Sequence, residues 1–153
     1  MPIFMQYDGI LGLATGKRKG WIELESCQWE QNRDVTNRSR RIEGIRAPSS
    51  SEIVVTHFQD AISPQLFRES IEGTRKKATI EFGNEPDPGH LQMYLRIELV
   101  NTMISSISSS TIGGSGKPTE SISLNFTKAT FSYDPNGASA AGPTHPTPTA
   151  VII

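Results

Sequence analysis

Cysteine is almost absent from this 153-residue chain, which contains only Cys27. A single thiol excludes a disulfide framework within the chain and any zinc site built from two or four cysteines. Long apolar runs are also missing, since none approaches the roughly 18 residues of a membrane-spanning helix. The first residues lack the basic and apolar regions of a signal peptide. We therefore expect a protein that is made in the cytoplasm, has no signal peptide and has no membrane partner.

An excess of charge of one sign is missing too, because 15 lysines and arginines stand against 16 acidic residues. This balance excludes a general polyanion binder of the histone type. Basic residues do cluster at 17–19, at 75–77 and within 31–51. Aromatic residues are not interleaved with them, as binding to single-stranded nucleic acid requires. We expect no nucleic-acid partner and interpret the clusters as solvent-facing surfaces or protein interfaces.

Serine, threonine, glycine and proline are what the chain has in quantity, while hydrophobic residues make up 35%. Because serine, threonine and glycine are poor helix formers, this composition favours strands and turns over a helix bundle. The length suits one domain, since domains commonly have roughly 100–150 residues.

Two segments alternate strictly between apolar and polar side chains, as a half-buried strand does. Every odd residue of 91–99 is apolar, and 78–82 repeats the pattern. Proline and glycine residues in 83–89 separate the two segments. We therefore expect an antiparallel hairpin over 78–99 with a long polar connection.

Two longer segments, 20–30 and 121–133, change phase partway. In the second, Leu124 and Phe131 have opposite parity. Either a bulge near residues 127–128 returns both sets to one side, or the strand leaves one core and enters a second contact. Bulged or bent strands form the corners of small closed or nearly closed barrels. We expect a mainly β fold, a small antiparallel β-barrel with one flanking short α-helix and an extended loop.

The one convincing helix begins near Ser63, which is predicted to be its N-cap and is followed by a proline. Gly73 is placed to end the helix. Leu66, Phe67 and Ile71 are expected to share one buried face. Because the helix is short, we expect it to be stabilised by packing over an end or an edge of the barrel.

The expected extended loop covers residues 31–51. It carries five arginines against two acidic residues, a local net charge of +3, and has no convincing periodicity. Such long loops are usually functional or disordered. The planar, bidentate guanidinium group is well suited to protein interfaces. The candidate interface residues are Arg33, Arg38, Arg40, Arg41 and Arg46.

The barrel domain is expected to span residues 1–136, and residues 137–153 are expected to be a tail. The tail has no charged residue and is rich in proline, alanine and threonine. Such a composition cannot build a core, so the tail is expected to be flexible or draped over the surface. Its last three residues, 151–153, are apolar, which leaves docking onto another surface open.

Motifs for catalysis are incomplete in this chain. The glycine-rich stretch 112–118 invites a phosphate-loop interpretation, but Pro118 stands where that motif needs serine or threonine. A strand pattern follows it, not the helix whose N-terminus would hold phosphate. Ser115 lacks the glycine spacing of a nucleophile elbow.

Metal and thiol chemistry find no support either. Cys27 has no basic residue close in sequence that would lower its pKa, so we expect an inert thiol. The histidines are scattered and lack the spacing of metal sites: they are His57, His90 and His145. We therefore expect no enzyme, no cofactor and no metal site.

The order of these elements resembles one protein family. The most specific stretches are Lys-Gly-Trp-Ile at 19–22 and Pro-Thr-Glu-Ser-Ile-Ser-Leu-Asn-Phe at 118–126. Between them lie Val-Val-Thr-His at 54–57, Ser-Pro-Gln-Leu at 63–66 and Ala-Thr-Ile-Glu-Phe at 78–82. Over about residues 2–134 this order resembles Hcp, the haemolysin-coregulated protein that forms the tube of bacterial type VI secretion systems.

The resemblance implies a subunit of a homohexameric ring. Rings stack into a tube inside a contractile sheath, a VgrG-type spike caps the tube, and secreted effectors can travel in the lumen. The protein would be cytoplasmic when assembled and would leave the cell, or enter a target cell, when the sheath contracts. In this family the segment after the second strand contacts neighbouring subunits, which places residues 31–51 at an interface.

Two other classes remain open at this point. One is a monomeric or dimeric ligand-binding β-barrel, with a pocket that Trp21 and Trp29 would line. The other is a hydrolase with divergent motifs, which the incomplete motifs disfavour.

Overall fold

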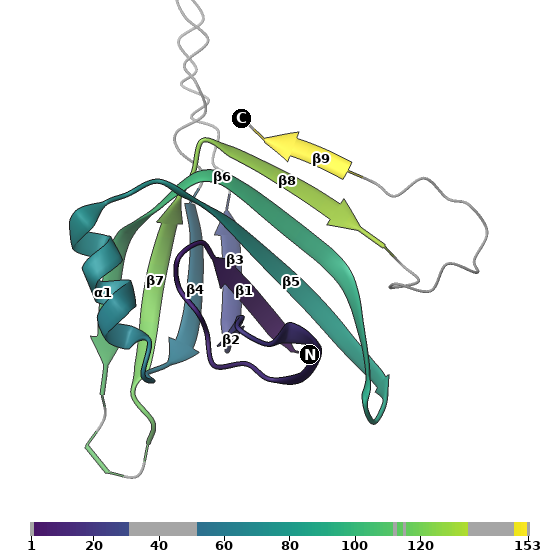
Figure 1. The fold of residues 1–153 in the computed structure, drawn as a ribbon, viewed down its shortest axis with the longest axis horizontal. Helices are drawn as coiled ribbons and strands as arrows, with labels where there is room; N and C mark the ends of the chain where they lie inside the picture. Colours follow the sequence, from purple (N-terminus) through teal and green to yellow (C-terminus); the bar gives the residue numbers. More distant parts are fainter. Residues whose placement is uncertain (1, 31–51, 112, 115, 135–148, 153) are drawn as a thin grey trace, which may run out of the picture.

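The computed structural model describes residues 2–30, 52–111, 113–114, 116–134 and 149–152 (Figure 1). These residues form nine strands, one α-helix and one short 3-10 helix. In chain order the elements are β1 (Ile3–Tyr7), η1 (Gly16–Arg18), β2 (Ile22–Leu24), β3 (Ser26–Glu30), β4 (Glu52–Phe58), α1 (Ser63–Glu72), β5 (Lys76–Asp87), β6 (His90–Ser110), β7 (Thr119–Asn125), β8 (Lys128–Tyr133) and β9 (Thr149–Ile152).

All strand pairs are antiparallel, and the sheet order is β2-β1-β5-β6-β7-β4-β3. β6 is long enough to pair with strands in both parts of the sheet. Its first half pairs with β5 and β8, and its second half pairs with β7. We call β1, β2, β5, β8, β9 and the first half of β6 sheet A, and β3, β4, β7 and the second half of β6 sheet B. The mainly antiparallel β fold with a single helix confirms the predicted fold class.

The strand ladders of the described residues do not close into a complete barrel, because the order of paired strands ends at β2 on one side and at β3 on the other. These two strands are consecutive in the chain and are separated only by Glu25. The Glu25 backbone N–H donates to the carbonyl of Thr56 at 2.7 Å. The two ends of the sheet are therefore joined by the chain itself, not by a strand ladder.

The predicted phase changes mark the places where the chain passes between the two sheets. Residues 20–30 divide into β2, which pairs with β1 in sheet A, and β3, which pairs with β4 in sheet B. Residues 121–133 divide in the same way into β7 and β8. Both halves of 121–133 face the same core, because Ile122, Leu124 and Ala129 lie in one buried cluster and Phe131 packs against it. Of the two alternatives, the return of both sets to a common side is the one observed, through a break between β7 and β8.

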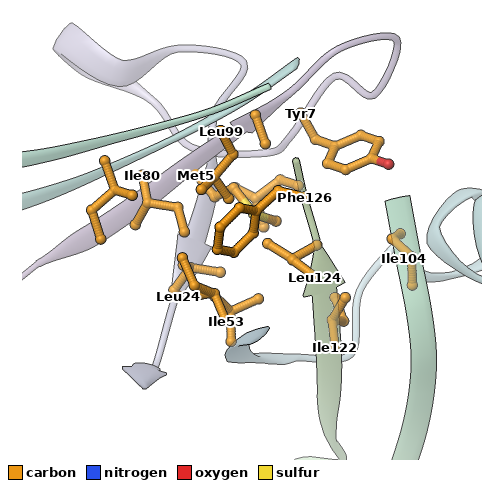
Figure 2. Close-up of a cluster of buried hydrophobic side chains, with 14 of the residues drawn as sticks. Met5, Tyr7, Leu24, Ile53, Ile80, Leu99, Ile104, Ile122, Leu124 and Phe126 are labelled. Carbon is orange, nitrogen blue, oxygen red and sulfur yellow. The ribbon is translucent and has the colours of Figure 1, made fainter. Parts of the chain in front are cut away.

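The core lies between the two sheets. It is built from the side chains at every second position of the strands. Met5, Ile53, Ile80 and Leu99 are fully buried and come from four different strands. Figure 2 shows such side chains gathered around the ring of Phe126. Burial of each such side chain contributes about 1.5–3 kcal/mol relative to exposure. The alternation read from the sequence is therefore the pattern that builds this core.

The helix forms where it was predicted, with two differences. Ser63 is its first helical residue and Ile62 occupies the N-cap position, without a side-chain cap. Leu66 is fully buried, but Phe67 and Ile71 are 57% and 71% exposed, so the prediction of one buried face is wrong. At about 100° per residue, Leu66 and Ile71 point about 140° apart. Gly73 ends the helix with a φ of +64°, as predicted.

No helix within the described ranges is long and apolar enough to span a membrane.

The hairpin also forms, but its connection is shorter than predicted. β5 and β6 continue to Asp87 and His90, which are register partners, so only Pro88 and Gly89 turn the chain. Gly89 adopts a φ of +84°, which glycine tolerates without strain. The predicted long connection over 83–89 is wrong because polar residues such as Asn84 extend the ladder, here opposite Gln92.

Candidate assembly surfaces

Ser63, His57 and Glu120 form a cluster that superficially resembles a catalytic set. The three come from α1, β4 and β7, and all are buried. Ser63 Oγ donates to Glu120 Oε2 at 2.9 Å, and His57 Nε2 lies 2.7 Å from the same oxygen. The carboxylate therefore lies between the hydroxyl and the imidazole. A serine nucleophile needs its hydroxyl proton directed at the imidazole, and here that proton is given to the carboxylate.

The same cluster anchors the start of the helix on sheet B. Ser63 Oγ also accepts the backbone N–H of Asp60 at 3.0 Å, and Asp60 Oδ1 accepts the N–H of Ile62 at 2.9 Å. Buried polar groups stabilise a fold only when they are paired, so the bonds of Ser63 fix the start of α1 against β7. Among the described residues, Nδ1 of the buried His57 has no hydrogen-bond partner. A hollow of about 430 Å³ lies beside it. Its walls are Gln59, Asp60, Ser63, Pro64, Phe67, Ile107, Ser109 and Glu120.

The described residues contain no group of three His, Cys, Asp or Glu side chains that could hold a metal ion. His57 lies in the buried cluster, His90 lies at the exposed end of the β5–β6 hairpin, and His145 lies outside the described residues. Burial raises the pKa of the Cys27 thiol to about 12. This agrees with the prediction of an inert thiol, since the thiolate is the reactive form.

The outward side of sheet B is a surface of hydroxyl groups, which we call the hydroxyl face. Strand register places Ser26, Thr56, Ser121 and Ser108 in one row across β3, β4, β7 and β6. The hydroxyls of Ser26 and Thr56 are 2.5 Å apart. Neighbouring rows add four more hydroxyl side chains, interrupted by the amide of Gln28 and the apolar Val54 and Phe58. The four are Ser106, Ser110, Thr119 and Ser123.

The hydroxyl face carries little charge. Among the described strand residues on this side, the charged ones are Glu30 and Glu52, which are register partners at one end. Sequence analysis did not identify this surface. Its signal is serine at alternate positions of 106–110 and 121–123. Only the strand order, which the sequence does not supply, puts these serines in common rows.

The outward side of sheet A is charged instead. Glu81 on β5 is buried, and its Oε2 accepts from Nε and Nη2 of Arg18 at 2.7 and 2.6 Å. Arg96 Nη1 lies 3.4 Å from the other Glu81 oxygen, and its Nη2 lies 3.2 Å from Glu98. The Arg18 guanidinium also lies over the ring of Trp21, 5.4 Å from its centroid. Arg18 is therefore engaged within the subunit, although the sequence groups it with a basic cluster.

The second basic cluster is also partly engaged. Arg75 donates to the carbonyl of Asn101 at 2.8 Å, and Lys76 donates to Glu69 Oε1 at 2.7 Å. Thr74 donates to the other Glu69 oxygen at 2.8 Å. Burial acts to raise the pKa of the Glu69 carboxyl, but the Lys76 and Thr74 hydrogen bonds outweigh it and lower that pKa below its ordinary value.

The two tryptophans do not share a pocket in the described part of the chain. Trp29 packs its ring against Phe82 and Phe131, with centroids 5.7 and 5.9 Å away. It therefore links β3 of sheet B to β5 and β8 of sheet A. Trp21 lies against Arg18 instead. This placement does not match the pocket that a ligand-binding barrel was expected to build from both side chains.

Exposed apolar side chains mark two further surfaces. Leu11 and Leu13, before η1, are 77% and 56% exposed, and Phe67 and Ile71 stand on the outer side of α1. Apolar groups that protrude into water are typical of surfaces that an assembly covers. The extended loop predicted over 31–51, with Arg33, Arg38, Arg40, Arg41 and Arg46, lies outside the described residues.

Solved structures similar to this chain include several Hcp proteins and a type VI secretion system effector. Hcp2 from Salmonella typhimurium is 25% identical, with a TM-score of 0.68, over 99% of this chain and 94% of that one. A type VI secretion system effector from Yersinia pestis is 20% identical, with a TM-score of 0.73, over 97% of both chains. A mutant of Hcp1 from the E. coli EAEC 042 pathovar is 19% identical, with a TM-score of 0.72, over 99% and 97%. A comparison with curated proteins gives no significant match.

A family model described as the type VI secretion system effector Hcp matches residues 4–133. The match includes all of β2 to β8, α1 and nearly all of β1. It confirms the resemblance that the motifs at 19–22 and 118–126 indicated. This chain therefore belongs to the Hcp family of type VI secretion tube proteins.

Proposed function

We propose that this chain is a structural subunit of a type VI inner tube, in which six copies close into a ring and the rings stack. Contraction of a surrounding sheath would expel the tube, with a VgrG-type spike at its tip and effectors in its lumen. Membership of the Hcp family supports this proposal. The assembled tube would be cytoplasmic and would be released from the cell, or into a target cell, on contraction.

The observation that carries the proposal is the contrast between the two outward sides of the sheet. One is the nearly uncharged hydroxyl face, and the other holds the charges around Glu81. We propose that the hydroxyl face lines the lumen. Short hydroxyl side chains can hydrogen-bond to many protein surfaces, but they lack the charge that would hold one cargo tightly. Such a lining suits a channel that must accept effectors and then release them.

The remaining surfaces would contact other subunits. A ring with rotational closure uses heterologous contacts, in which two different patches of the same chain meet. The exposed Leu11 and Leu13 and the arginine-rich loop 31–51 are our candidates for such patches. Arginine forms bidentate pairs with carboxylates, so acidic residues of a neighbouring copy would be its partners.

Native mass spectrometry of the purified chain tests ring formation. We expect a mass of six copies and annular particles by negative-stain microscopy. A chain that stays monomeric at high concentration in both measurements would contradict the proposal.

Thiol labelling of intact rings tests the orientation of the hydroxyl face. Ser108→Cys would place a thiol on this face, and Arg68→Cys would place one on the exposed side of α1. We expect a small maleimide to label both variants fully and a bulky polyethylene-glycol maleimide to label only Arg68→Cys fully, because a lumen admits few bulky chains. Equal labelling of the two variants by the bulky reagent would place the hydroxyl face on the outside.

A further inference from the structure

β9 covers the outer edge of sheet A by pairing with β8. Register joins Thr130 to Val151 and Ser132 to Thr149 in an antiparallel ladder. The other edge of β8 pairs with β6, so β9 occupies the edge that β8 would otherwise leave open. Figure 1 shows β9 as the outermost strand, on the side of the sheet away from α1. An uncovered edge presents unpaired N–H and C=O groups that another chain can join.

The connection between β8 and β9 is too long to be a hairpin loop. Residues 134–148 separate the two strands, whereas hairpin loops have about two to five residues. Fully extended at about 3.3 Å per residue, fifteen residues reach about 50 Å. A globular chain of this length has a radius of gyration of about 15 Å and hence a diameter of about 40 Å. The connection between β8 and β9 is therefore long enough for β9 to reach the β8 edge of an adjoining copy.

The ladder itself does not distinguish one copy from another. β9 makes the same backbone pairs along 129–132 whether β8 belongs to its own chain or to a neighbouring one. Exchange of an identical element between copies is therefore a low-cost route to association. In a closed ring every copy supplies one β9 and one β8 edge, so an exchange all the way round leaves no edge open.

We propose that β9 is exchanged when rings form, so that β9 of each copy pairs with β8 of the next. The partner is a second copy of this chain, and backbone pairing along β8 recognises it. This inference rests on the proposed ring assembly. In a free subunit β9 covers its own β8 edge, and in the ring the same strand fastens two subunits together.

Disulfide trapping between β8 and β9 tests the exchange. Register partners in an antiparallel ladder have Cα atoms about 4.5–5.5 Å apart, a separation that a disulfide can bridge. Thr130→Cys and Val151→Cys would be made in separate chains, each with Cys27→Ala, and the two chains would be unfolded, mixed in equal amounts and reassembled. A cross-link between these two chains can form only if β9 of one pairs with β8 of the other.

After mild oxidation we expect covalent dimers on a non-reducing gel. If the two chains mix at random, about a quarter of the contacts between neighbouring copies bring the two thiols together. Because each cross-link joins two chains, complete oxidation would cross-link about half of the chains on average. The double variant Thr130→Cys/Val151→Cys should yield cross-linked chains running from dimer upward. The matched control Glu98→Cys/Thr130→Cys joins register partners on β6 and β8, strands that the proposal leaves paired within one chain, and should yield only internally cross-linked monomers.

Native mass of the same samples separates the two proposals. A monomeric mass would overturn the ring assembly and the exchange with it. Rings without dimers in the mixture, together with internal cross-links in the double variant, would overturn the exchange and leave the ring intact. No cross-link in the double variant would overturn the pairing of β8 with β9 on which the exchange depends.

Discussion

Arg18 and Glu81 join the 3-10 helix before β2 to the middle of β5 through a single carboxylate oxygen. Nε and Nη2 of Arg18 lie 2.7 and 2.6 Å from Oε2 of Glu81, and Glu81 is 5% exposed. Removing one partner of a buried pair leaves the other charge without compensation, whereas exposed pairs contribute little. The pair therefore holds the loop that precedes β2 against sheet A.

Arg18→Met should lower the free energy of unfolding by about 1–3 kcal/mol, because Glu81 would keep only the longer contact to Arg96. The apolar methionine stem retains packing against Trp21. Urea unfolding followed by circular dichroism measures the change. Arg68→Met is the matched control, since its pair with Glu72 is exposed, and it should leave the unfolding midpoint unchanged. Equal effects of the two substitutions would show that the Arg18 pair is no stronger than a surface pair.

Leu66 and Phe67 are adjacent on α1 and should respond differently to truncation. Leu66 is fully buried in the core, and Phe67 is mostly exposed. Leu66→Ala should cost about 2–5 kcal/mol of stability, because it removes buried methyl groups and leaves a cavity. Phe67→Ala should cost less than about 1 kcal/mol in the free subunit, since it removes little buried area. Thermal unfolding of the two variants under conditions that favour single subunits compares them, and a larger loss for Phe67→Ala would contradict the observed orientation of α1.

Much of this fold could be predicted from local pattern. The alternation in 78–99 predicted the hairpin, because period-two burial is a property of a strand alone. Gly73 predicted the helix end for the same local reason. Helix geometry alone shows that Leu66 and Ile71 cannot share one face, so that part of the prediction was avoidable. Which of the two meets the sheet depends on contacts distant in sequence and could not be predicted. The hydroxyl face depends on strand order, which is set by contacts distant in sequence.

Cys27 should be almost unreactive in the folded subunit. Cys27 is partly buried, and this burial raises its thiol pKa to about 12, so much less of it is thiolate at pH 8 than for the ordinary thiol. Alkylation by iodoacetamide should be markedly slower than in the urea-unfolded chain. Mass spectrometry of the alkylated protein measures both rates. Comparable rates in the folded and unfolded chains would contradict burial of this thiol.

Glu69 should make stability depend on pH in the acidic range. Its pKa is lowered in the folded state despite burial, because Lys76 and Thr74 donate to the carboxylate. A lowered folded-state pKa gives stability that is fully present above the unfolded value of about 4.3 and is lost as the pH falls through the folded value. The glutamine of Glu69→Gln does not titrate, so this variant lacks the contribution at every pH. The variant should be less stable than the natural chain at pH 7, and the difference should shrink at pH 3, as urea unfolding at the two pH values would measure.

Arg40 and Arg41 should matter for assembly and not for the folding of the subunit. Both lie in the positively charged segment 31–51, which we propose contacts neighbouring copies. Reversing both charges with Arg40→Glu/Arg41→Glu would place carboxylates where a partner's carboxylates are expected, so repulsion should weaken association. Native mass spectrometry should show smaller species, while circular dichroism and the unfolding midpoint of the subunit stay the same.

The control Arg40→Lys/Arg41→Lys keeps the charge and should retain rings. Association between subunits should weaken modestly, because lysine lacks the bidentate geometry of arginine. An unchanged ring mass for the charge-reversed variant would remove these two arginines from the interface.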